Sequence, residues 1–310
     1  MTKRLMLLDT ASLYFRAYFG VPDSVQAPDG TPVNAVRGLL DFITRLVGDY
    51  DPSHLACCWD NDWRPRWRVD LIPSYKGHRV LAPRPGGVDV EVTPDPLVPQ
   101  VPIIVDVLEA LGLAIVGADG YEADDVIGTL AARAEMPVDI VTGDRDLFQL
   151  VDDERGVRVL YTARGVGRHE RVTEETVVRK YGVLPQQYAD FATLRGDSSD
   201  GLPGVAGVGE KTAASLLATH GDLEGVLAAV GDEASGLAGA LRGKIRAAAD
   251  YLAVAPKVVA VERQIALPEI DLEMPQPAPR DPHRLQELID QWGLGGSAER
   301  VVAALNRAPG

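Results

Sequence analysis

The chain has little cysteine and no long apolar run. Of its 310 residues only two are cysteines, Cys57 and Cys58, and they are adjacent. Successive side chains of a strand point to opposite faces, so both thiols are predicted to lie in the core and to form no disulfide. The absence of an apolar run of roughly eighteen residues excludes a membrane-spanning helix, and residues 5–8 are too short for a secretory signal. These absences predict a protein of the reducing cytoplasm that contacts no membrane.

Positive charge is scarce but concentrated. The 31 basic residues face 45 acids, and the resulting net charge of −14 by itself argues against nucleic acid as a partner. Between Arg64 and Arg84, however, six cations accompany one acid, which makes this window net +5. Trp63, Trp67 and Tyr75 are interleaved here, a pattern that suits a single strand of nucleic acid because bases stack on rings while phosphates pair with cations. The alternative is an exposed helical hairpin whose aromatic side chains pack on the parent domain.

Three apolar segments that are predicted to be strands end in aspartate. They span residues 5–8, 55–59 and 138–141, and they alternate with segments of helical periodicity such as residues 34–48. This alternation predicts an α/β fold with a mostly parallel sheet and helices on both faces. Ligand sites of such sheets lie outside the carboxyl ends of the strands, so the aspartates are expected to converge there.

Further carboxylates cluster between Gly120 and Val151. Like charges packed so closely repel unless a cation lies among them. Oxygen ligands in such number suit magnesium or manganese better than zinc. The carboxylates of this stretch are Glu122, Asp124, Asp125, Asp144 and Asp146.

A glycine-rich turn follows at residues 203–209, and a helix is predicted to start just after it. Free backbone N–H groups at the start of that helix would suit a phosphate. The turn nearly matches a nucleotide-binding P-loop, but Glu210 stands where that loop needs lysine, and no strand precedes it. A helix–hairpin–helix that grips a duplex backbone fits better, with Lys211 adding a point charge.

As a set, these motifs resemble the 5′-nuclease family, which comprises flap endonucleases and the 5′→3′ exonuclease domain at the N-terminus of bacterial DNA polymerase I. The resemblance extends from about residue 8 to about residue 260. It implies that nine acids are active-site carboxylates that bind two or more magnesium or manganese ions. They are Asp9, Asp60, Glu122, Asp124, Asp125, Asp144, Asp146, Asp197 and Asp200.

The resemblance also implies a domain organisation. A PIN-like nuclease domain is expected over residues 1–184, with a helical arch inserted at about 61–99. An all-α helix–three-turn–helix subdomain is expected over residues 185–260, followed by a C-terminal extension over 261–310.

Individual side chains acquire implied roles in the same way. Lys76 and Arg79 would contact the scissile phosphate in catalysis, and Asp125 is also expected to be catalytic. The glycine-rich turn would bind duplex DNA with the help of a potassium ion. The residues expected to contact DNA are Tyr75, Lys76, Arg79, Gly207, Gly209, Lys211 and Thr212.

The implied reaction is hydrolysis of DNA phosphodiesters at 5′ ends and at the base of 5′ flaps, with two metal ions clamping the attacking and leaving oxygens. The expected substrates are flapped, nicked or gapped duplexes. The protein is expected to be a free-standing monomer that works with a DNA polymerase and a ligase in replication and repair. One ion is expected at Asp60, Glu122 and Asp124. The other is expected to be held or oriented by Asp125, Asp144, Asp146 and Asp197, and Asp9 and Asp200 are expected to act through bound water.

Three departures from the family pattern stand out. Gly201 occupies the place where the family usually has asparagine. Asp62 replaces a lysine of many relatives and is interpreted as surface charge, with an outer-shell metal contact as the alternative. One extra residue separates Asp60 from the pair Tyr75 and Lys76.

Three other functions remain as alternatives. A non-catalytic DNA-structure-binding module is disfavoured because all nine acids are present. A phosphohydrolase of the haloacid-dehalogenase type would need a second aspartate two residues after Asp9, where Ala11 stands. A PIN-type ribonuclease shares the acidic sheet edge, but the glycine-rich turn and the arch favour DNA.

Overall fold

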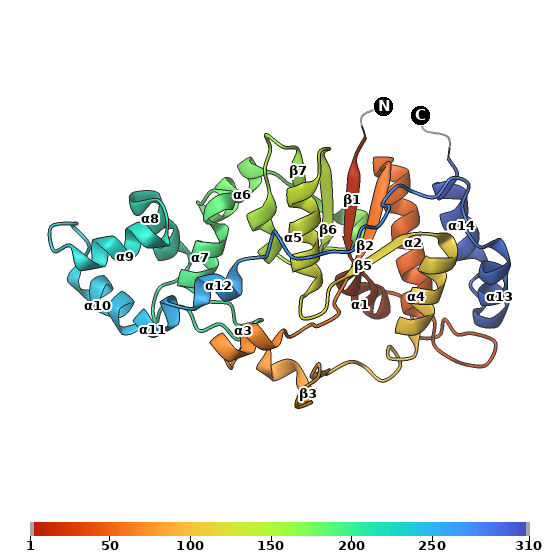
Figure 1. Cartoon of the computed structure of the whole chain (residues 1–310), viewed down its shortest axis with the longest axis horizontal. Helices are drawn as coiled ribbons and strands as arrows, with labels where there is room; N and C mark the ends of the chain where they lie inside the picture. Colours follow the sequence, from red (N-terminus) through yellow and green to blue (C-terminus); the bar gives the residue numbers. More distant parts are fainter. Residues whose placement is uncertain (1–2, 308–310) are drawn as a thin grey trace.

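The computed structural model describes residues 3–307, and its centre is a six-stranded sheet (Figure 1). The strand order is β5-β2-β1-β6-β7-β8, and every pairing is parallel except that of β7 with β8. The strands are β1 Leu5–Asp9, β2 His54–Trp59, β5 Ala114–Gly117, β6 Val138–Thr142, β7 Val157–Tyr161 and β8 Glu170–Val172. The three strands that run into aspartate are therefore neighbours, and the predicted α/β class is confirmed.

Alternate residues of β1 point into two separate cores. Met6 and Leu8 pack with the helices on one face of the sheet, and Leu5 and Leu7 with those on the other. The second face is covered by α5 Ala123–Arg133 and the short 3-10 helix η2 Asp146–Leu150. The first face is covered by α1 Thr10–Gly20, α2 Asn34–Tyr50, α4 Gln100–Leu111, α13 Pro282–Trp292 and α14 Gly295–Leu305.

The two cysteines lie side by side in β2 but face opposite cores. Cys57 packs in the first core and Cys58 in the second, and both are 0% exposed with free thiols. The prediction of core residues without a disulfide is confirmed. Burial raises the pKa of Cys57 to about 12, so the thiol stays protonated and unreactive in the folded protein. Over residues 3–307, no helix is both long and apolar enough to cross a bilayer.

The C-terminal helices complete the first core. Helix α13 packs on α4 and α14 packs on α2, which buries Leu285, Leu288 and Val301 (Figure 1). The segment before them runs along β2, where the N–H of Leu55 donates to the carbonyl of Leu272 at 2.8 Å. The residues expected to form an extension are thus integrated into the sheet domain.

Residues 61–99, where a helical arch is expected, include only a little helix. They contain the short helix α3 Arg66–Leu71, the 3-10 turn η1 Gly77–Arg79 and an antiparallel ribbon of β3 Val80–Ala82 and β4 Val90–Glu91. Closely spaced prolines and glycines interrupt longer helices because proline lacks the N–H that a helix needs. Ile72 and Tyr75 are buried against Leu202 and Val258, so this insertion is docked on the helical part of the chain.

A helical part follows the sheet and ends beside α3 (Figure 1). The 3-10 helix η3 Val166–Arg168 lies between β7 and β8. The helices are α6 Glu174–Tyr181, η4 Pro185–Gln187, α7 Tyr188–Arg195, α8 Glu210–His220, α9 Leu223–Gly231, α10 Gly239–Ala247, α11 Ala249–Leu252 and α12 Ala255–Val259. Pro256 lies in the first turn of α12, where proline is tolerated because the N–H groups there have no partner within the helix.

Candidate active site

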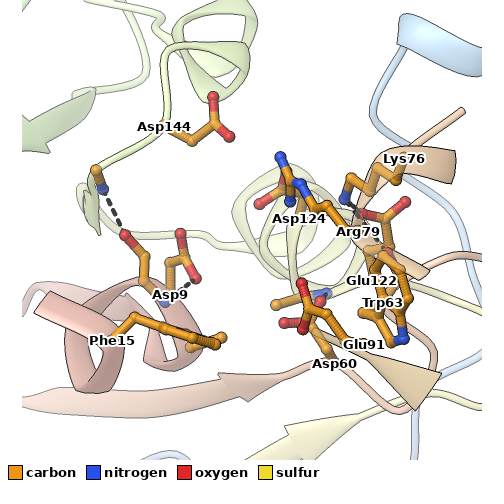
Figure 2. A pocket seen from close by; sticks show the side chains of 14 residues that line it. Asp9, Phe15, Asp60, Trp63, Lys76, Arg79, Glu91, Glu122, Asp124 and Asp144 are labelled. Carbon is orange, nitrogen blue, oxygen red and sulfur yellow. Dashed lines mark hydrogen bonds and ion pairs between the residues drawn. The ribbon is translucent and has the colours of Figure 1, made fainter. Parts of the chain in front are cut away.

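Acidic side chains from separate segments meet in a cavity of about 350 Å³ beside the carboxyl ends of β1, β2 and β6 (Figure 2). Lys76 and Arg79 reach this cavity from the insertion. Its acidic lining is Asp9, Asp60, Glu91, Glu122, Asp124 and Asp144. Glu91 was not predicted from the sequence, in which the only indication is an acidic residue between two valines. The predicted convergence of the strand-end aspartates is present.

Local structure orients Asp9 and Asp60. One oxygen of Asp9 caps α1 by accepting the N–H of Ser12 at 3.2 Å, and the other accepts the Thr142 hydroxyl at 2.6 Å. Asp60 accepts the N–H of Ala123 at 2.8 Å, at the start of α5. Each carboxylate therefore lies at a helix N-terminus, where the helix dipole favours negative charge. A carboxylate has about four lone-pair sites, so both retain acceptor capacity.

The cavity strongly disfavours the ionised form of the carboxylates that line it. Burial, and then the neighbouring carboxylates, raise the pKa of Asp9 to about 7 and hold the pKa of Asp124 well above its ordinary value. The pKa of Asp60 is also raised, mainly by burial. A divalent cation would relieve this repulsion, and an all-oxygen donor set fits magnesium or manganese. The residues present therefore fit such an ion.

Lys76 neutralises one edge of the cavity. Its buried ammonium donates to Glu122, and it also lies 3.3 Å from the carbonyl of Trp63. Burial alone would raise the pKa of Glu122, but the charges of Lys76 and Arg68 lower it. Within residues 3–307 no three acidic, histidine or cysteine side chains already surround one point as a closed cage. Glu122 is thus paired with protein cations in this arrangement.

Asp146 and Asp200 line a small adjoining cavity of about 20 Å³ that shares Glu122 and Asp124 with the main one. Burial raises the pKa of Asp200 to about 6 and the pKa of Asp146 well above its ordinary value. The guanidinium of Arg79 donates to Asp200 at 3.1 Å. These two carboxylates therefore adjoin the main acidic group.

Asp125 lines neither cavity, and its expected metal-binding and catalytic roles stay predictions. Its oxygens accept two hydrogen bonds from Arg68 at 2.7 and 2.8 Å, one from the N–H of Glu122 at 3.2 Å and one from the N–H of Glu262 at 2.9 Å. The side chain is 0% exposed. Asp125 is a buried ion-pair partner and helix cap, and Arg68, which sequence reasoning passed over, holds it.

Asp197 is also engaged by protein groups. One of its oxygens pairs with Arg195 at 3.0 Å, and the other accepts the N–H of Ser199 at 2.8 Å. Burial would raise its pKa, but these partners lower it. Asp197 lines neither cavity, and its assignment as a residue that holds or orients a metal ion stays a prediction.

The aromatic side chains of the insertion point inward. Tyr75 is 4% exposed and its hydroxyl donates to Glu122 at 2.7 Å, so in this conformation the ring is not available for the expected contact with DNA, which stays a prediction. The indole of Trp63 donates to the carbonyl of Asp89 at 2.8 Å. The Tyr75 ring is buried as the alternative expects, but it packs with Leu202 and Val258 of the helical part rather than on the sheet domain. Asp62 is buried rather than surface charge, and it accepts the N–H of Arg64 at 3.1 Å.

The glycine-rich turn leads into α8 with Gly209 as its N-cap residue. Lys211 is exposed and Thr212 half-buried in the first turn of this helix. Gly207 adopts a φ of +72°, and its carbonyl accepts the ammonium of Lys244 at 3.3 Å. A side-chain cation thus already contacts a carbonyl of the turn at which a potassium ion was expected.

Two family models match nearly the whole chain. The model described as 5′-3′ exonuclease, N-terminal resolvase-like domain, matches residues 4–182, and the model described as 5′-3′ exonuclease, C-terminal SAM fold, matches residues 183–282. A protein named 5′-3′ exonuclease from Streptomyces coelicolor is 63% identical over 97% of this chain and 99% of its own length. A second protein of that name, from Mycobacterium tuberculosis, is 49% identical over the full length of both chains.

More distant similarities extend the comparison. DNA polymerase I of Mycobacterium tuberculosis is 44% identical over 72% of this chain and 24% of its own length. A solved structure of T5 5′-exonuclease with bound zinc has a TM-score of 0.62 at 14% identity, covering 98% of both chains. Flap endonuclease-1 from Methanococcus jannaschii has a TM-score of 0.61 at 12% identity, covering 98% of this chain and 93% of that one. At these identities the two structures support the fold.

Proposed function

The chain belongs to the 5′-3′ exonuclease family, and on that premise we propose that it hydrolyses DNA phosphodiesters at 5′ ends and at the base of 5′ flaps. The observation that carries the proposal is the acidic cavity with Lys76 and Arg79 at its edge. A cavity that is negative at its base and cationic at one edge can hold a phosphodiester only when divalent ions reside among the carboxylates.

Divalent ions, magnesium or manganese, would be held by Asp9, Asp60, Asp124 and Asp144, with Asp146 and Asp200 close by. When bound, such ions supply an activated water and stabilise charge on the leaving oxygen. The raised pKa values of Asp9 and Asp124 support this set, because these groups gain most from a nearby cation.

The basic side chains handle the phosphate. The ammonium of Lys76, which now donates to Glu122, would donate to a non-bridging oxygen of the scissile phosphate. Arg79, which now donates to Asp200, can donate to the same group. Both would orient the phosphodiester for in-line attack and stabilise the charge that develops on it.

The duplex beside the scissile bond is assigned to the start of α8, where Gly207, Gly209, Lys211 and Thr212 present N–H groups and one cation. Binding through phosphate contacts releases counterions, so affinity should fall steeply as salt rises. A potassium ion at this turn stays a prediction, since Lys244 already supplies a cation to Gly207.

We further propose that the protein acts as a cytoplasmic monomer on flapped, nicked or gapped duplexes, between a polymerase that displaces the 5′ strand and a ligase that seals the product. The deciding assay compares a labelled 5′ flap, a nicked duplex, a blunt duplex and single-stranded RNA, with magnesium, with manganese and with chelator. Metal-dependent release from the flap and the nick supports the proposal. Cleavage of the RNA alone would favour a ribonuclease, and binding without cleavage a DNA-structure-binding protein.

A further inference from the structure

Main-chain contacts dock the insertion on the loop that follows α7. The N–H of Lys76 donates to the carbonyl of Asp200 at 2.9 Å, and the hydroxyl of Ser74 donates to the carbonyl of Gly201 at 2.8 Å. Arg79 donates to a further carbonyl of this loop at 2.9 Å. The loop thus holds the segment that carries both basic residues of the cavity.

Gly201 lies at the closest approach between the two segments. A Cβ placed on it would lie 2.2 Å from the carbonyl oxygen of Ser74 and 3.6 Å from the nitrogen of Lys76. Contacts of that kind with main-chain atoms cannot be relieved by a side-chain rotation. The φ of Gly201 is +70°, which also favours glycine. A side chain such as the asparagine usual in the family would therefore push the insertion away.

The docked segment holds Lys76 in an unusual conformation. Its φ is +47°, in the left-handed region that residues other than glycine rarely adopt, and the turn η1 starts at the next residue. Such conformations persist when the surroundings over-determine them, and they are frequent at active sites. The hydrogen bond from the Lys76 N–H to Asp200 is part of those surroundings.

We propose that Gly201 is a positioning residue: its missing side chain lets residues 74–79 dock on the loop and thereby places Lys76 and Arg79 over the catalytic carboxylates. This inference rests on the proposed nuclease function, since it concerns how the basic residues reach the scissile phosphate. The docking itself can be measured without any substrate.

The first experiment uses hydrogen exchange in the full-length protein carrying Gly201→Asn. Asparagine tolerates a positive φ better than most residues, so the substitution mainly adds the clash with Ser74. The matched control is Gly236→Asn, because Gly236 has a φ of +74°, close to that of Gly201, and a Cβ there would meet no atom of residues 3–307 within 4 Å. The amide of Lys76 should exchange at least roughly tenfold faster in Gly201→Asn, and at the wild-type rate in the control.

The second experiment follows flap cleavage. Gly201→Asn should lower kcat by about 10²-fold while leaving KM nearly unchanged, because the lost contact acts on the transition state. Adding Gly201→Asn to the double variant Lys76→Ala/Arg79→Ala should cause no further loss, which a general structural defect would not reproduce. Should Gly201→Asn fail to fold, Ser74→Ala removes one docking hydrogen bond without adding atoms, and it should also accelerate exchange at Lys76.

The two experiments distinguish a failure of the positioning role of Gly201 from a failure of the proposed nuclease function. Wild-type exchange at Lys76 together with wild-type kcat in Gly201→Asn would overturn the positioning role, as would unchanged exchange in Ser74→Ala if the first variant does not fold. A wild-type protein that cleaves none of the DNA substrates would instead overturn the proposed function, and the exchange measurement would then still decide whether Gly201 permits docking.

Discussion

Arg68 holds Asp125 with both terminal nitrogens, at 2.7 and 2.8 Å, across 57 residues of sequence. The same guanidinium donates to Glu122 at 2.9 Å and to the carbonyl of Val258 at 3.1 Å. One side chain thus connects the insertion, the start of α5 and the end of the helical part. Since its charged partners are almost fully buried, this cluster links the stability of the fold to the geometry of the cavity.

Asp125→Asn should destabilise the protein more than it affects metal binding. The amide cannot pair with both nitrogens of Arg68, and breaking a buried pair from one side typically costs about 3 kcal/mol or more. Denaturant unfolding in the presence of chelator measures this loss. Wild-type stability combined with complete loss of cleavage would instead support the predicted role of Asp125 as a catalytic metal ligand.

Asp124→Asn should have the opposite effect on stability. It removes a charge that Asp9 and Asp144 repel, so the chelated variant should melt at a higher temperature than the wild type. Manganese affinity should fall at least roughly tenfold, because a ligand is lost. Titration calorimetry with manganese tests the second effect, and an unchanged affinity would exclude Asp124 as a ligand.

The chelated protein should lose stability as the pH rises from about 4 to about 7. Asp9 and Asp200 have folded-state pKa values of about 7 and about 6, above their ordinary value of 3.8. Groups with raised pKa values favour the folded state while protonated, and that contribution disappears as the pH passes through the folded pKa. Magnesium should flatten the trend by stabilising the ionised carboxylates. Thermal melts across this range with chelator and with magnesium test it, and a stability that rises with pH in chelator would contradict it.

Arg79→Ala should reduce kcat on a flap substrate by on the order of 10²-fold, because one electrostatic contact to the phosphate is lost. Arg66→Ala is the matched control, since Arg66 lies on the same insertion but pairs with Asp70 on its own helix and is highly exposed. The control should retain wild-type kcat. Equal losses in both variants would indicate general electrostatic attraction of DNA rather than a contact at the scissile phosphate.

Lys244→Ala should change how duplex binding responds to potassium. Lys244 donates to the carbonyl of Gly207, so the wild type should bind a nicked duplex equally well in potassium and sodium salts of the same ionic strength. Without the ammonium, the turn should bind more tightly in potassium than in sodium. Fluorescence anisotropy measures both, and a strong potassium requirement in the wild type would show that Lys244 does not replace the ion.

The sheet and the meeting of its strand-end aspartates were predictable because both follow from local patterns. An apolar run that ends in aspartate marks the carboxyl end of a strand, and parallel strands bring such ends together. The roles of Asp124 and Asp125 were less accessible. Adjacent helix residues point about 100° apart, so only one of this pair can face the cavity. Sequence position gives no indication which one meets Arg68.

The structure of the insertion was also beyond sequence reasoning. The interleaved rings and cations of residues 61–99 predict a nucleic-acid contact, yet the hydroxyl of Tyr75 donates a hydrogen bond to Glu122. Tyr75 and Glu122 are far apart in sequence, and the periodicity of a segment does not show which distant residues it will contact. Glu91 was missed for a similar reason, because a two-residue strand has no pattern of its own.

The adjacent thiols of β2 offer a built-in pair of reporters. Each thiol belongs to a different core. Alkylation of Cys57 therefore requires the layer of α1, α2 and α4 to separate from the sheet, and alkylation of Cys58 requires the layer of α5 to separate. With Cys57→Ser and Cys58→Ser variants, labelling rates would tell whether the two sides of the molecule open together or one after the other, without any dye having been attached.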